Sequence, residues 1–595
     1  DLYTSTNGPG WIRKENWLVT PTVDDWIGVT VSGGHVTGLS LEENLLSGSL
    51  PASLGDLSEL IVLSLRNNQL NGSLPPELGS LSHLTYLSLR VNDLTGSIPP
   101  ALGDLTGLTT LDLYRNRLTG AIPPELGSLS KLIDLDLSSN ALSGSIPPEL
   151  GNLTALSYLF LGWNQLTGGI PPALGKLTSL THLSLADNPL GGGIPTTLGS
   201  LTNLTHLWLY RCQLSGTLPA QLGNLTNLYW LNLKENLLSG SIPPQLGNLS
   251  NLHSLSLSSN LLSGTVPPEL GDLTSLSDLS LDANQLSGAI PAELAGLPLF
   301  YLDLSANQLT GEIPPEIDQM TDLHFLLLSG NQLTGSIPPA LGDLTYLYKL
   351  DLSGNLLSGA IPPELGDLTN VRRLDLSANQ LTGDIPATFI NLTNLTYPYP
   401  DLPAGLNLDY NLLNVPADYL QMTDPLYTLL YLYDPDWHLR QGFSIQLSTP
   451  GGDFTSLDGR LHVLVPPGAL EGKTIFTFHP QPSPSHAPGR LIYANHTFLL
   501  SAVPTLGIPV TVFDWPLTVT ITYTPDDHAS FPETSLALYF WTGEVNGWQD
   551  ATLSWPDGAY TRDLDADTLS FPLWHLSEFA LFGTNLHAFL PLVVR

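Results

Sequence analysis

Three carboxylates near the end of the chain are the first candidate for chemistry, as a calcium site. Asp563, Asp565 and Asp567 alternate, so on a strand their side chains would share one face. Calcium binds such clusters of carboxylate oxygens. However, the glycine and glutamate that an EF-hand loop requires at fixed positions are absent. We therefore interpret the triplet as a solvated acidic strand edge that discourages aggregation, and we predict no metal and no cofactor.

The segment 573–582, Leu-Trp-His-Leu-Ser-Glu-Phe-Ala-Leu-Phe, is a second candidate. It resembles the cleavage signature of autoproteolytic adhesion-receptor domains. That resemblance implies that His575 is a base, that the hydroxyl of Ser577 is the nucleophile, and that the bond between Leu576 and Ser577 breaks. The paired cysteines of that family are missing, and cleavage would also need a strained peptide bond. A plain structural strand is the interpretation that we favour.

Other catalytic motifs are absent. The sequence contains no P-loop, no HExxH zinc motif, no nucleophile elbow and no dinucleotide fingerprint. Its one cysteine, Cys212, excludes an internal disulfide and a cysteine-based zinc site. We expect this thiol to be buried and structural rather than nucleophilic. The chain is therefore predicted not to be an enzyme.

A repeat organises most of the chain. Around each repeated asparagine stands one phrase, for example Leu84-x-x-Leu87-x-Leu89-x-x-Asn92-x-Leu94-x-Gly96-x-Ile98-Pro99. Alternation places Leu87 and Leu89 on the inward face of a short strand, and the asparagine amide can bond the backbone of neighbouring coils. A fixed period of this length predicts a solenoid whose stacked coils share one core. The asparagines recur at a spacing of 24, with one deletion before Asn307: Asn44, Asn68, Asn92, Asn116, Asn140, Asn164, Asn188, Asn236, Asn260, Asn284, Asn307, Asn331, Asn355 and Asn379.

The phrase resembles the plant-type subclass of leucine-rich repeats, which bacterial surface proteins also carry. The resemblance covers residues 34–396, about fifteen repeats, and implies parallel strands on a concave face with an irregular convex side. Residues 1–33 resemble the N-terminal cap of this family. Plant members hold a cysteine pair in the cap where this chain has Asp24 and Val31. That difference fits a cap closed by packing alone and favours a bacterial member.

Regularity ends after residue 396. Residues 397–430 are interpreted as a degenerate last repeat and C-terminal cap, which a solenoid needs to cover its core. From residue 431 to 595, short alternating segments such as 443–447, 461–465, 517–523 and 536–540 are broken by Pro and Gly. They predict an all-β sandwich domain. The stretch 451–470 resembles the β-sandwich found in ankyrins and netrin receptors.

Aromatic and basic residues gather at outward strand positions of successive coils. Such residues make interface hot spots, and cations beside aromatic rings suggest a ligand with carboxylates, sugars or both. Cross-strand packing of the rings among themselves is the simpler alternative. The predicted binding residues are Arg90, Tyr114, Arg115, Tyr158, Phe160, Trp163, His182, His206, Trp208, Tyr210, Arg211, Trp230 and Lys234.

Composition narrows the function further. The 595 residues carry 19 basic and 54 acidic side chains, a net charge of −35, which argues against nucleic acid and anionic membranes as partners. No apolar stretch approaches the roughly 20 residues that span a bilayer, so we predict no direct membrane insertion.

We therefore predict an extracellular or cell-surface recognition or adhesion protein that binds a protein, peptide or glycan ligand on its concave face. The alternative is a structural subunit that self-associates into a filament, sheath or surface layer. Two features suggest this alternative. The chain starts inside the expected cap, which would leave an open edge, and the apolar segment 589–595 of another copy could pair with that edge head to tail.

Overall fold

The computed structural model describes residues 1–396, 405–415, 425–433 and 441, and, between 443 and 583, the backbone of the strands given below. The chain divides into two compact units. Unit 1 comprises residues 1–310 with 319–325, and unit 2 comprises residues 311–318 with 326–595.

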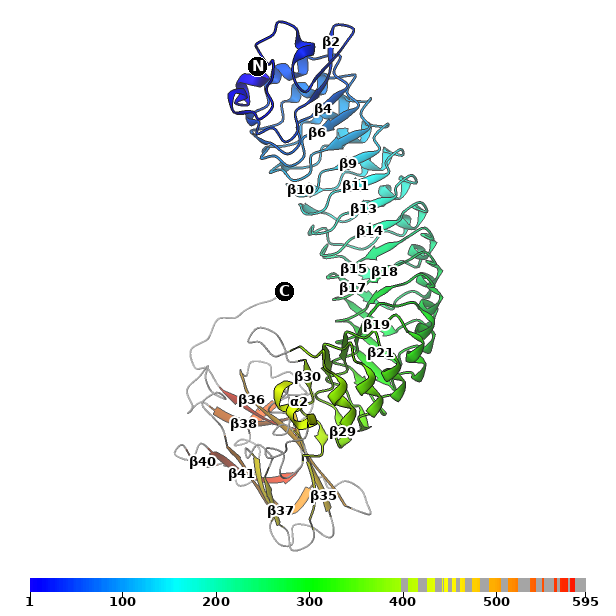
Figure 1. Ribbon diagram of the computed structural model, residues 1–595, viewed down its shortest axis with the longest axis vertical. Coiled ribbons are helices and arrows are strands. Elements are labelled where there is room, and N and C mark those ends of the chain that lie inside the picture. Colours follow the sequence, from blue (N-terminus) through cyan, green and yellow to red (C-terminus); the bar gives the residue numbers. More distant parts are fainter. Residues whose placement is uncertain are drawn as a thin grey trace. The chain divides into compact units, whose positions relative to one another are not determined.

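A cap built from aromatic rings begins unit 1 (blue in Figure 1). It consists of α1 (Leu2–Ser5), η1 (Gly8–Gly10), η2 (Val23–Asp25) and β1 (Val29–Ser32), which pairs antiparallel with β2 (His35–Ser40). Its core is a chain of rings in which Trp11 and Trp17 lie 4.9 Å apart, and Trp17 and Trp26 lie 4.8 Å apart. The cap is thus held by ring packing, as expected for a cap without cysteines.

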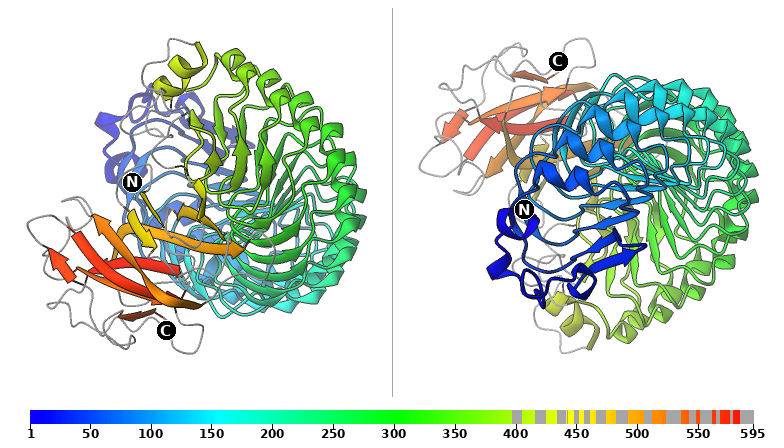
Figure 2. Two further views of the ribbon diagram at one scale, coloured as in Figure 1. Left: turned by 90° about the horizontal axis from the view of Figure 1, so that it is seen from below. Right: turned by 90° about the horizontal axis from the view of Figure 1, so that it is seen from above.

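Beyond the cap, each coil of unit 1 has a short strand on the inner side and a 3-10 helix on the outer side (Figure 2). The inner strands are parallel and in register, so that Tyr158, Leu159 and Phe160 stand beside His182, Leu183 and Ser184. Equivalent positions of successive coils therefore form rows across the inner face. The inner strands are β2, β4 (Val62–Ser64), β6 (Tyr86–Ser88), β7 (Thr110–Asp112), β9 (Asp134–Asp136), β11 (Tyr158–Phe160), β13 (His182–Ser184), β14 (His206–Trp208), β16 (Trp230–Asn232), β18 (Ser254–Ser256), β20 (Asp278–Ser280) and β22 (Tyr301–Asp303).

The outer side consists of five-residue 3-10 helices that pack closely. Most start with proline, whose missing N–H is not needed in the first turn. The glycine at the fourth position of most of these helices allows close stacking, since a Cβ at Gly103 would lie 2.4 Å from the carbonyl oxygen of Glu125 in the next coil. The helices are η3 (Ala52–Asp56), η4 (Pro76–Ser80), η5 (Pro100–Asp104), η6 (Pro124–Ser128), η7 (Pro148–Asn152), η8 (Pro172–Lys176), η9 (Thr196–Ser200), η10 (Ala220–Asn224), η11 (Pro244–Asn248), η12 (Pro268–Asp272) and η13 (Ala292–Gly296).

A second set of short strands follows the turn after each inner strand. In unit 1 these are β3 (Ser47–Ser49), β5 (Gln69–Asn71), β8 (Thr119–Gly120), β10 (Ala141–Ser145), β12 (Gln165–Thr167), β15 (Ser215–Thr217), β17 (Leu237–Gly240), β19 (Leu261–Thr265) and β21 (Gln285–Gly288). Between the inner strands, the second strands and the 3-10 helices, the repeated leucines are almost completely buried, and Leu159 and Leu161 have no exposed surface. Each such side chain contributes about 1.5–3 kcal/mol through burial.

Buried asparagines bind neighbouring coils together. The Nδ2 atom of Asn92 donates to the carbonyl oxygens of Leu65 (3.1 Å) and Leu89 (3.0 Å), and its Oδ1 accepts from the N–H of Leu70 (3.0 Å). Leu65 and Leu70 belong to the preceding coil, so one side chain satisfies buried backbone groups of two coils. The expected asparagine ladder is confirmed at the corresponding positions, for example at Asn164 and Asn260.

Cys212 takes the asparagine position in one coil. Its buried Sγ lies 3.2 Å from the carbonyl oxygen of Leu185, so the thiol donates where an amide otherwise would. Unlike asparagine, cysteine has no side-chain oxygen that could accept an N–H of the preceding coil. In that coil the N–H of Leu190 donates to the carbonyl oxygen of Asn188 at 2.8 Å. Gly191 and Gly192 make this detour with φ angles of 66° and 69°. The structural role expected for Cys212 is confirmed.

The next coils run through β23 (Gln308–Gly311), η14 (Pro315–Gln319), β24 (Phe325–Leu327) and β25 (Gln332–Leu333). Unit 2 continues the same architecture to its last coil, where Asn411 accepts from the N–H of Leu381 at 3.1 Å. Beyond it, Gln441 takes the place of a ladder asparagine, since its Nε2 donates to Leu408 O at 2.9 Å and its Oε1 accepts from Leu413 N at 3.3 Å. The ladder thus closes on a residue beyond the boundary expected at residue 430. The elements here are η15 (Pro339–Asp343), β26 (Lys349–Asp351), β27 (Ser358–Ala360), η16 (Pro363–Asp367), β28 (Arg373–Asp375), β29 (Gln380–Gly383), η17 (Ala387–Asn391), β30 (Leu406–Asn407), β31 (Leu412–Leu413) and α2 (Pro425–Tyr433).

The rest of unit 2 contains two antiparallel sheets. One has the order β32 (Phe443–Leu447), β35 (Thr474–Gln481), β36 (Ile492–Pro504), β42 (Glu578–Gly583), β38 (Leu536–Trp541) and β39 (Trp548–Asp550). The other has the order β33 (Gly452–Thr455), β34 (Leu461–Val465), β37 (Val512–Thr522), β41 (Thr568–His575) and β40 (Thr561–Asp563). Strands are thus found at the four segments named from the sequence, while their packing as a sandwich stays a prediction.

We expect Asn260→Ala to lower the free energy of unfolding by about 2 kcal/mol, because it leaves the buried N–H of Leu238 without its acceptor and removes one of the two asparagine donors from the carbonyl oxygens of Leu233 and Leu257. Asn251→Ala is the control, since its amide makes only an exposed bond to Thr226 O, and should cost less than about 1 kcal/mol. Urea unfolding of the full chain, with amide hydrogen exchange at Leu238, measures both. Equal effects of the two substitutions would contradict the ladder's importance.

Candidate binding surface

The side chains on either side of each inward leucine form the exposed inner face of unit 1. From β11 to β16 this face is rich in aromatic rings, of which Tyr158, Trp163 and Trp230 are 38%, 50% and 41% exposed. Phe160 and Trp208 lie 6.5 Å apart although their coils are two apart, and Trp163 and Tyr210 lie 6.1 Å apart. Neighbouring rings do contact one another, as the simpler alternative requires, and yet large parts of them remain exposed.

These rings surround a depression of about 350 Å³, which we call the aromatic hollow. Five predicted residues, Phe160, Trp163, Trp208, Tyr210 and Trp230, form its walls. Sequence reasoning missed the polar part of the lining, which consists of Asp136, Ser138, Ser184 and Asn232. Their outward register was the only available signal, and it does not show which outward residues reach a common depression.

Two histidines stack beside the hollow. His182 and His206 have ring centroids 4.3 Å apart and planes inclined by 10°. The hydroxyl of Thr181 donates to Ser157 O and lies 2.9 Å from Nδ1 of His182. Because that hydroxyl has already used its one proton, Nδ1 of His182 must be the donor, which leaves Nε2 as an acceptor. Thr205 fixes the tautomer of His206 in the same way.

Burial lowers the pKa of both histidines, and the proximity of His206 lowers the pKa of His182 further. Both rings are therefore neutral at pH 7, and each presents Nε2 as a hydrogen-bond acceptor.

Two basic residues beside the hollow are paired with carboxylates, Arg211 with those of neighbouring coils and Lys234 with that of the residue after it. Arg211 donates to Glu235 at 2.6 and 3.1 Å and lies 3.8 Å from Asp187. Nζ of Lys234 lies 3.9 Å from Glu235 and 5.9 Å from the centre of the Tyr210 ring. Arg211 and Lys234 thus already have counter-ions, while the expectation that the ligand carries carboxylates, sugars or both stays a prediction.

Arg90 is paired in the same way, 3.9 Å from Asp112 and 5.1 Å from the ring of Tyr114. Arg115 is exposed and occupies the turn residue before Asn116, with a φ of 52°. Arg90, Tyr114 and Arg115 therefore belong to the inner face but do not line the hollow.

Carboxylates are crowded upstream of the hollow. Burial, together with the neighbouring carboxylates, raises the pKa of Asp134 to about 6. Burial raises the pKa of Asp136 to about 6 as well, although Ser138 donates to its carboxylate from N–H at 2.9 Å and from its hydroxyl. The pKa of Asp112 is also raised by burial, against hydrogen bonds from Ser88 and Tyr114. The hollow thus has an acidic edge.

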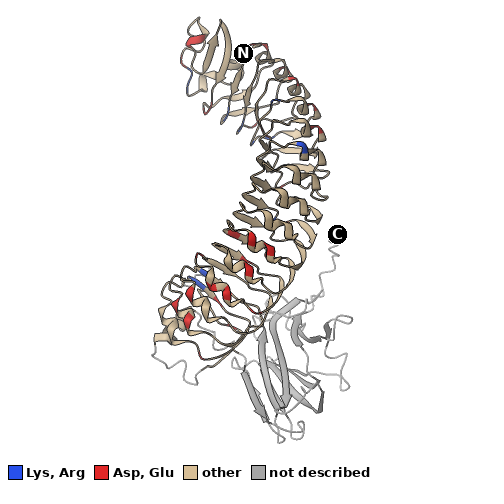
Figure 3. Cartoon of the chain, turned by 90° about the vertical axis from the view of Figure 1, so that its right-hand side faces the viewer, with Lys and Arg blue, Asp and Glu red and all other residues tan. Residues whose placement is uncertain are grey.

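Acidic residues also mark the outer side, where the first turn of several 3-10 helices carries Glu or Asp, such as Glu269 in η12 and Glu364 in η16 (Figure 3). Glu269 and Glu364 are exposed. They account for part of the strong negative charge without adding a binding feature.

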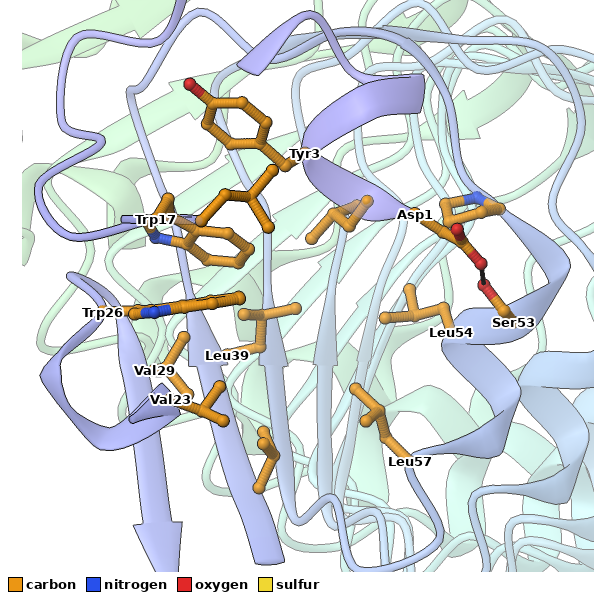
Figure 4. A pocket seen from close by; sticks show the side chains of 14 residues that line it. Asp1, Tyr3, Trp17, Val23, Trp26, Val29, Leu39, Ser53, Leu54 and Leu57 are labelled. Carbon is orange, nitrogen blue, oxygen red and sulfur yellow. Dashed lines mark hydrogen bonds between the residues drawn. The ribbon is translucent and has the colours of Figure 1, made fainter. Parts of the chain in front are cut away.

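A second depression, of about 300 Å³, lies in the cap. Figure 4 shows that Trp17, Trp26, Leu39 and Leu54 point into it, with Asp1 and Ser53 bonded to each other at its rim at 2.7 Å. Its lining is mostly apolar, and the polar side chains of Asp1 and Ser53 are bonded to each other, so it offers few polar groups to orient a ligand.

Two of the candidate residues near the C-terminus lie at strand ends. Asp563 ends β40 and His575 ends β41, whereas Asp565, Asp567 and Ser577 lie outside the described residues. The same holds for the apolar segment 589–595 on which head-to-tail assembly was based. Within the described residues, no group of three metal-binding side chains converges, and no helix has the length and apolar character that crossing a bilayer requires.

Family comparisons agree with the repeat pattern. A model of a leucine-rich repeat region matches residues 47–190. A second model, the leucine-rich repeat, matches residues 203–225, 227–249, 251–273, 298–320, 322–344, 346–368 and 370–392. No curated protein matches the chain significantly.

Solved structures with the same repeats include several plant receptors. The plant peptide hormone receptor RGFR1 in complex with RGF2 is 36% identical at a TM-score of 0.58, over 66% of each chain. The TDR receptor is 33% identical at a TM-score of 0.55, over 63% of this chain and 71% of the receptor chain. The ectodomain of the Arabidopsis receptor kinase HAESA, in complex with an N-terminally extended IDA peptide hormone, is 29% identical at a TM-score of 0.52. The match covers 71% of this chain and 88% of the ectodomain chain. The chain thus spans about two thirds of the length of the first of these relatives.

We expect Cys212 to be inert in the folded protein, because it is fully buried and burial raises the pKa of its thiol to about 12. The thiol reagent DTNB at pH 8 should release no colour from the native chain and one equivalent after unfolding in guanidinium. Rapid reaction of the native chain would contradict a purely structural role.

The stacked histidines predict a pH effect. Because folding lowers the pKa of His182, protonation disfavours the folded state, and stability is lost as pH falls below the ordinary value of 6.5. His206→Gln should raise the pKa of His182, measured by NMR titration of the ring, since the neighbouring positive charge is removed. His83→Gln, at an exposed ring outside the hollow, is the control, and an unchanged pKa in His206→Gln would refute the coupling.

Proposed function

Because the chain belongs to the leucine-rich-repeat family, we propose that it is a non-catalytic recognition protein that binds a peptide ligand at the aromatic hollow. The observation that carries this proposal is the hollow itself, in which five aromatic residues from three coils surround about 350 Å³. Exposed aromatic clusters of this kind mark interaction sites, because burying them on a partner gives much of the binding free energy.

The relatives favour a peptide as the ligand. Two of the solved plant receptors carry a peptide hormone, and both share the repeat architecture of this chain. A glycan would also stack on aromatic rings, but nothing in the relatives supports it. The inner strands provide a row of hydrogen-bonding side chains beside the hollow, including Ser184, Asn232 and Nε2 of His182, which suits the amide groups of an extended peptide.

The proposed location is extracellular or at the cell surface, in keeping with the ectodomain named among the relatives. The C-terminal sheets would then serve to position the solenoid, packed as a sandwich. Adhesion would be one use of the same surface. Self-assembly into filaments remains a separate proposal that rests on residues outside the described part of the chain.

The experiment is selection from a peptide display library with the full chain, followed by affinity measurement on the selected peptides. Trp208→Ala should weaken binding by at least about 30-fold, as expected when an aromatic anchor worth about 2 kcal/mol is removed. Tyr346→Ala is the matched control, since this aromatic side chain is 57% exposed and lies outside the hollow. The proposal fails if no peptide is selected, or if both variants bind as the unchanged chain does.

A further inference from the structure

We propose that the aromatic hollow receives a cationic side chain of the ligand, arginine or lysine, with Asp136 as its counter-ion. This inference rests on the proposed function, since it names the residue type that a bound peptide would place there. Among the residues that line the hollow, Asp136 is the only one with a charged side chain, and the others are aromatic or small and polar.

Asp136 has room for such a partner. Both of its hydrogen bonds within the described residues end on Oδ1, from the N–H and the hydroxyl of Ser138. Oδ2 takes part in neither, and no ion pair within 4.0 Å joins Asp136 to a described basic residue. The nearest cation that affects it, Arg90, is paired with Asp112.

The chain itself shows how this combination binds cations. Arg90 lies between the carboxylate of Asp112 and the ring of Tyr114. Lys234 lies between the carboxylate of Glu235 and the ring of Tyr210. A carboxylate beside an aromatic face is thus used twice on this surface to hold a positive charge. The hollow offers the same pair of features, namely Asp136 and the rings around it, to a side chain from outside.

Charge complementarity supports the same occupant. Five carboxylates and four cations stand on the inner face near the hollow, and the one charged side chain that lines the hollow is the carboxylate of Asp136, so a cationic group is favoured there over an anionic one. The carboxylates are Asp112, Asp134, Asp136, Asp187 and Glu235, and the cations are Arg90, Arg115, Arg211 and Lys234.

The first test uses the full chain and a positional-scanning library of hexapeptides with acetylated and amidated ends, so that terminal charges play no part. We expect Arg or Lys to be enriched at one position, and replacing that Arg by its neutral analogue citrulline to weaken binding at least tenfold. Enrichment of acidic or neutral residues, or equal affinity for Arg and citrulline, would overturn the inference. If the binding still depended on Trp208, the proposed function would stand. Absence of Trp208-dependent binding would overturn both.

The second test asks whether Asp136 is the carboxylate that attracts the cationic side chain. Asp136→Asn keeps the size and the Oδ1 acceptor for Ser138, and it should reduce the preference for Arg over citrulline to less than threefold. Asp322→Asn, on a surface turn outside the hollow, is the matched control and should leave the preference unchanged. An unchanged preference in Asp136→Asn overturns the assignment of the counter-ion.

A pH series sharpens this result. Protonation of Asp136 removes the negative charge, so affinity for the Arg peptide should fall as pH drops through about 6, and fall less in Asp136→Asn. Asp112, Asp134, His182 and His206 also titrate near this face, and their contribution remains in both proteins. Identical pH profiles for the two proteins would overturn the inference.

Discussion

The structure depends on one requirement, that the backbone groups buried where each coil turns must find hydrogen-bond partners. An asparagine amide meets it by serving two coils at once, as Asn164 does with Leu137 and Leu142 of the coil before. This geometry requires the residue before the asparagine to adopt a left-handed conformation, which costs a non-glycine residue roughly 1–2 kcal/mol. The asparagine bonds offset that cost, and two coils avoid it by placing Gly330 and Gly354 there.

The strained position connects the ladder to the binding surface. In unit 1, the residues that precede the asparagine position and lie next to the hollow are Trp163, Asp187, Arg211 and Glu235, with φ angles of 53°, 54°, 54° and 55°. Later coils place small residues such as Ala283 and Ala306 at the same point. The backbone thus bears the same strain throughout, and near the hollow it presents large or charged side chains.

The sequence predicts the core well, because burial and stacking repeat with one period. Leucines, ladder asparagines and the buried Cys212 follow from register alone, and so do the rows of outward aromatic residues. The hollow and the pairing of cations do not follow, because they depend on side-chain rotamers. Arg211 and Glu235 are 24 residues apart and so must be neighbours, but register does not tell whether Arg211 turns to Glu235 or to a ligand. The end of the ladder was also unpredictable, since Gln441 follows Asn411 by 30 residues instead of 24.

The fold does not need the aromatic cluster, and this separates the functional surface from the scaffold. The coils of β18 and β20 place Ser254, Ser256, Asp278 and Ser280 at the outward positions, while Leu255 and Leu279 stay as fully buried as Leu207. Small polar residues there are therefore compatible with the same core and the same ladder. Contacts between neighbouring rings stabilise the sheet only modestly, and the rings add exposed apolar surface that favours unwanted association. Because stacking fixes every inward position, the outward positions from β11 to β16 are where the chain can differ in chemistry without changing its fold, and that is where the rings are concentrated.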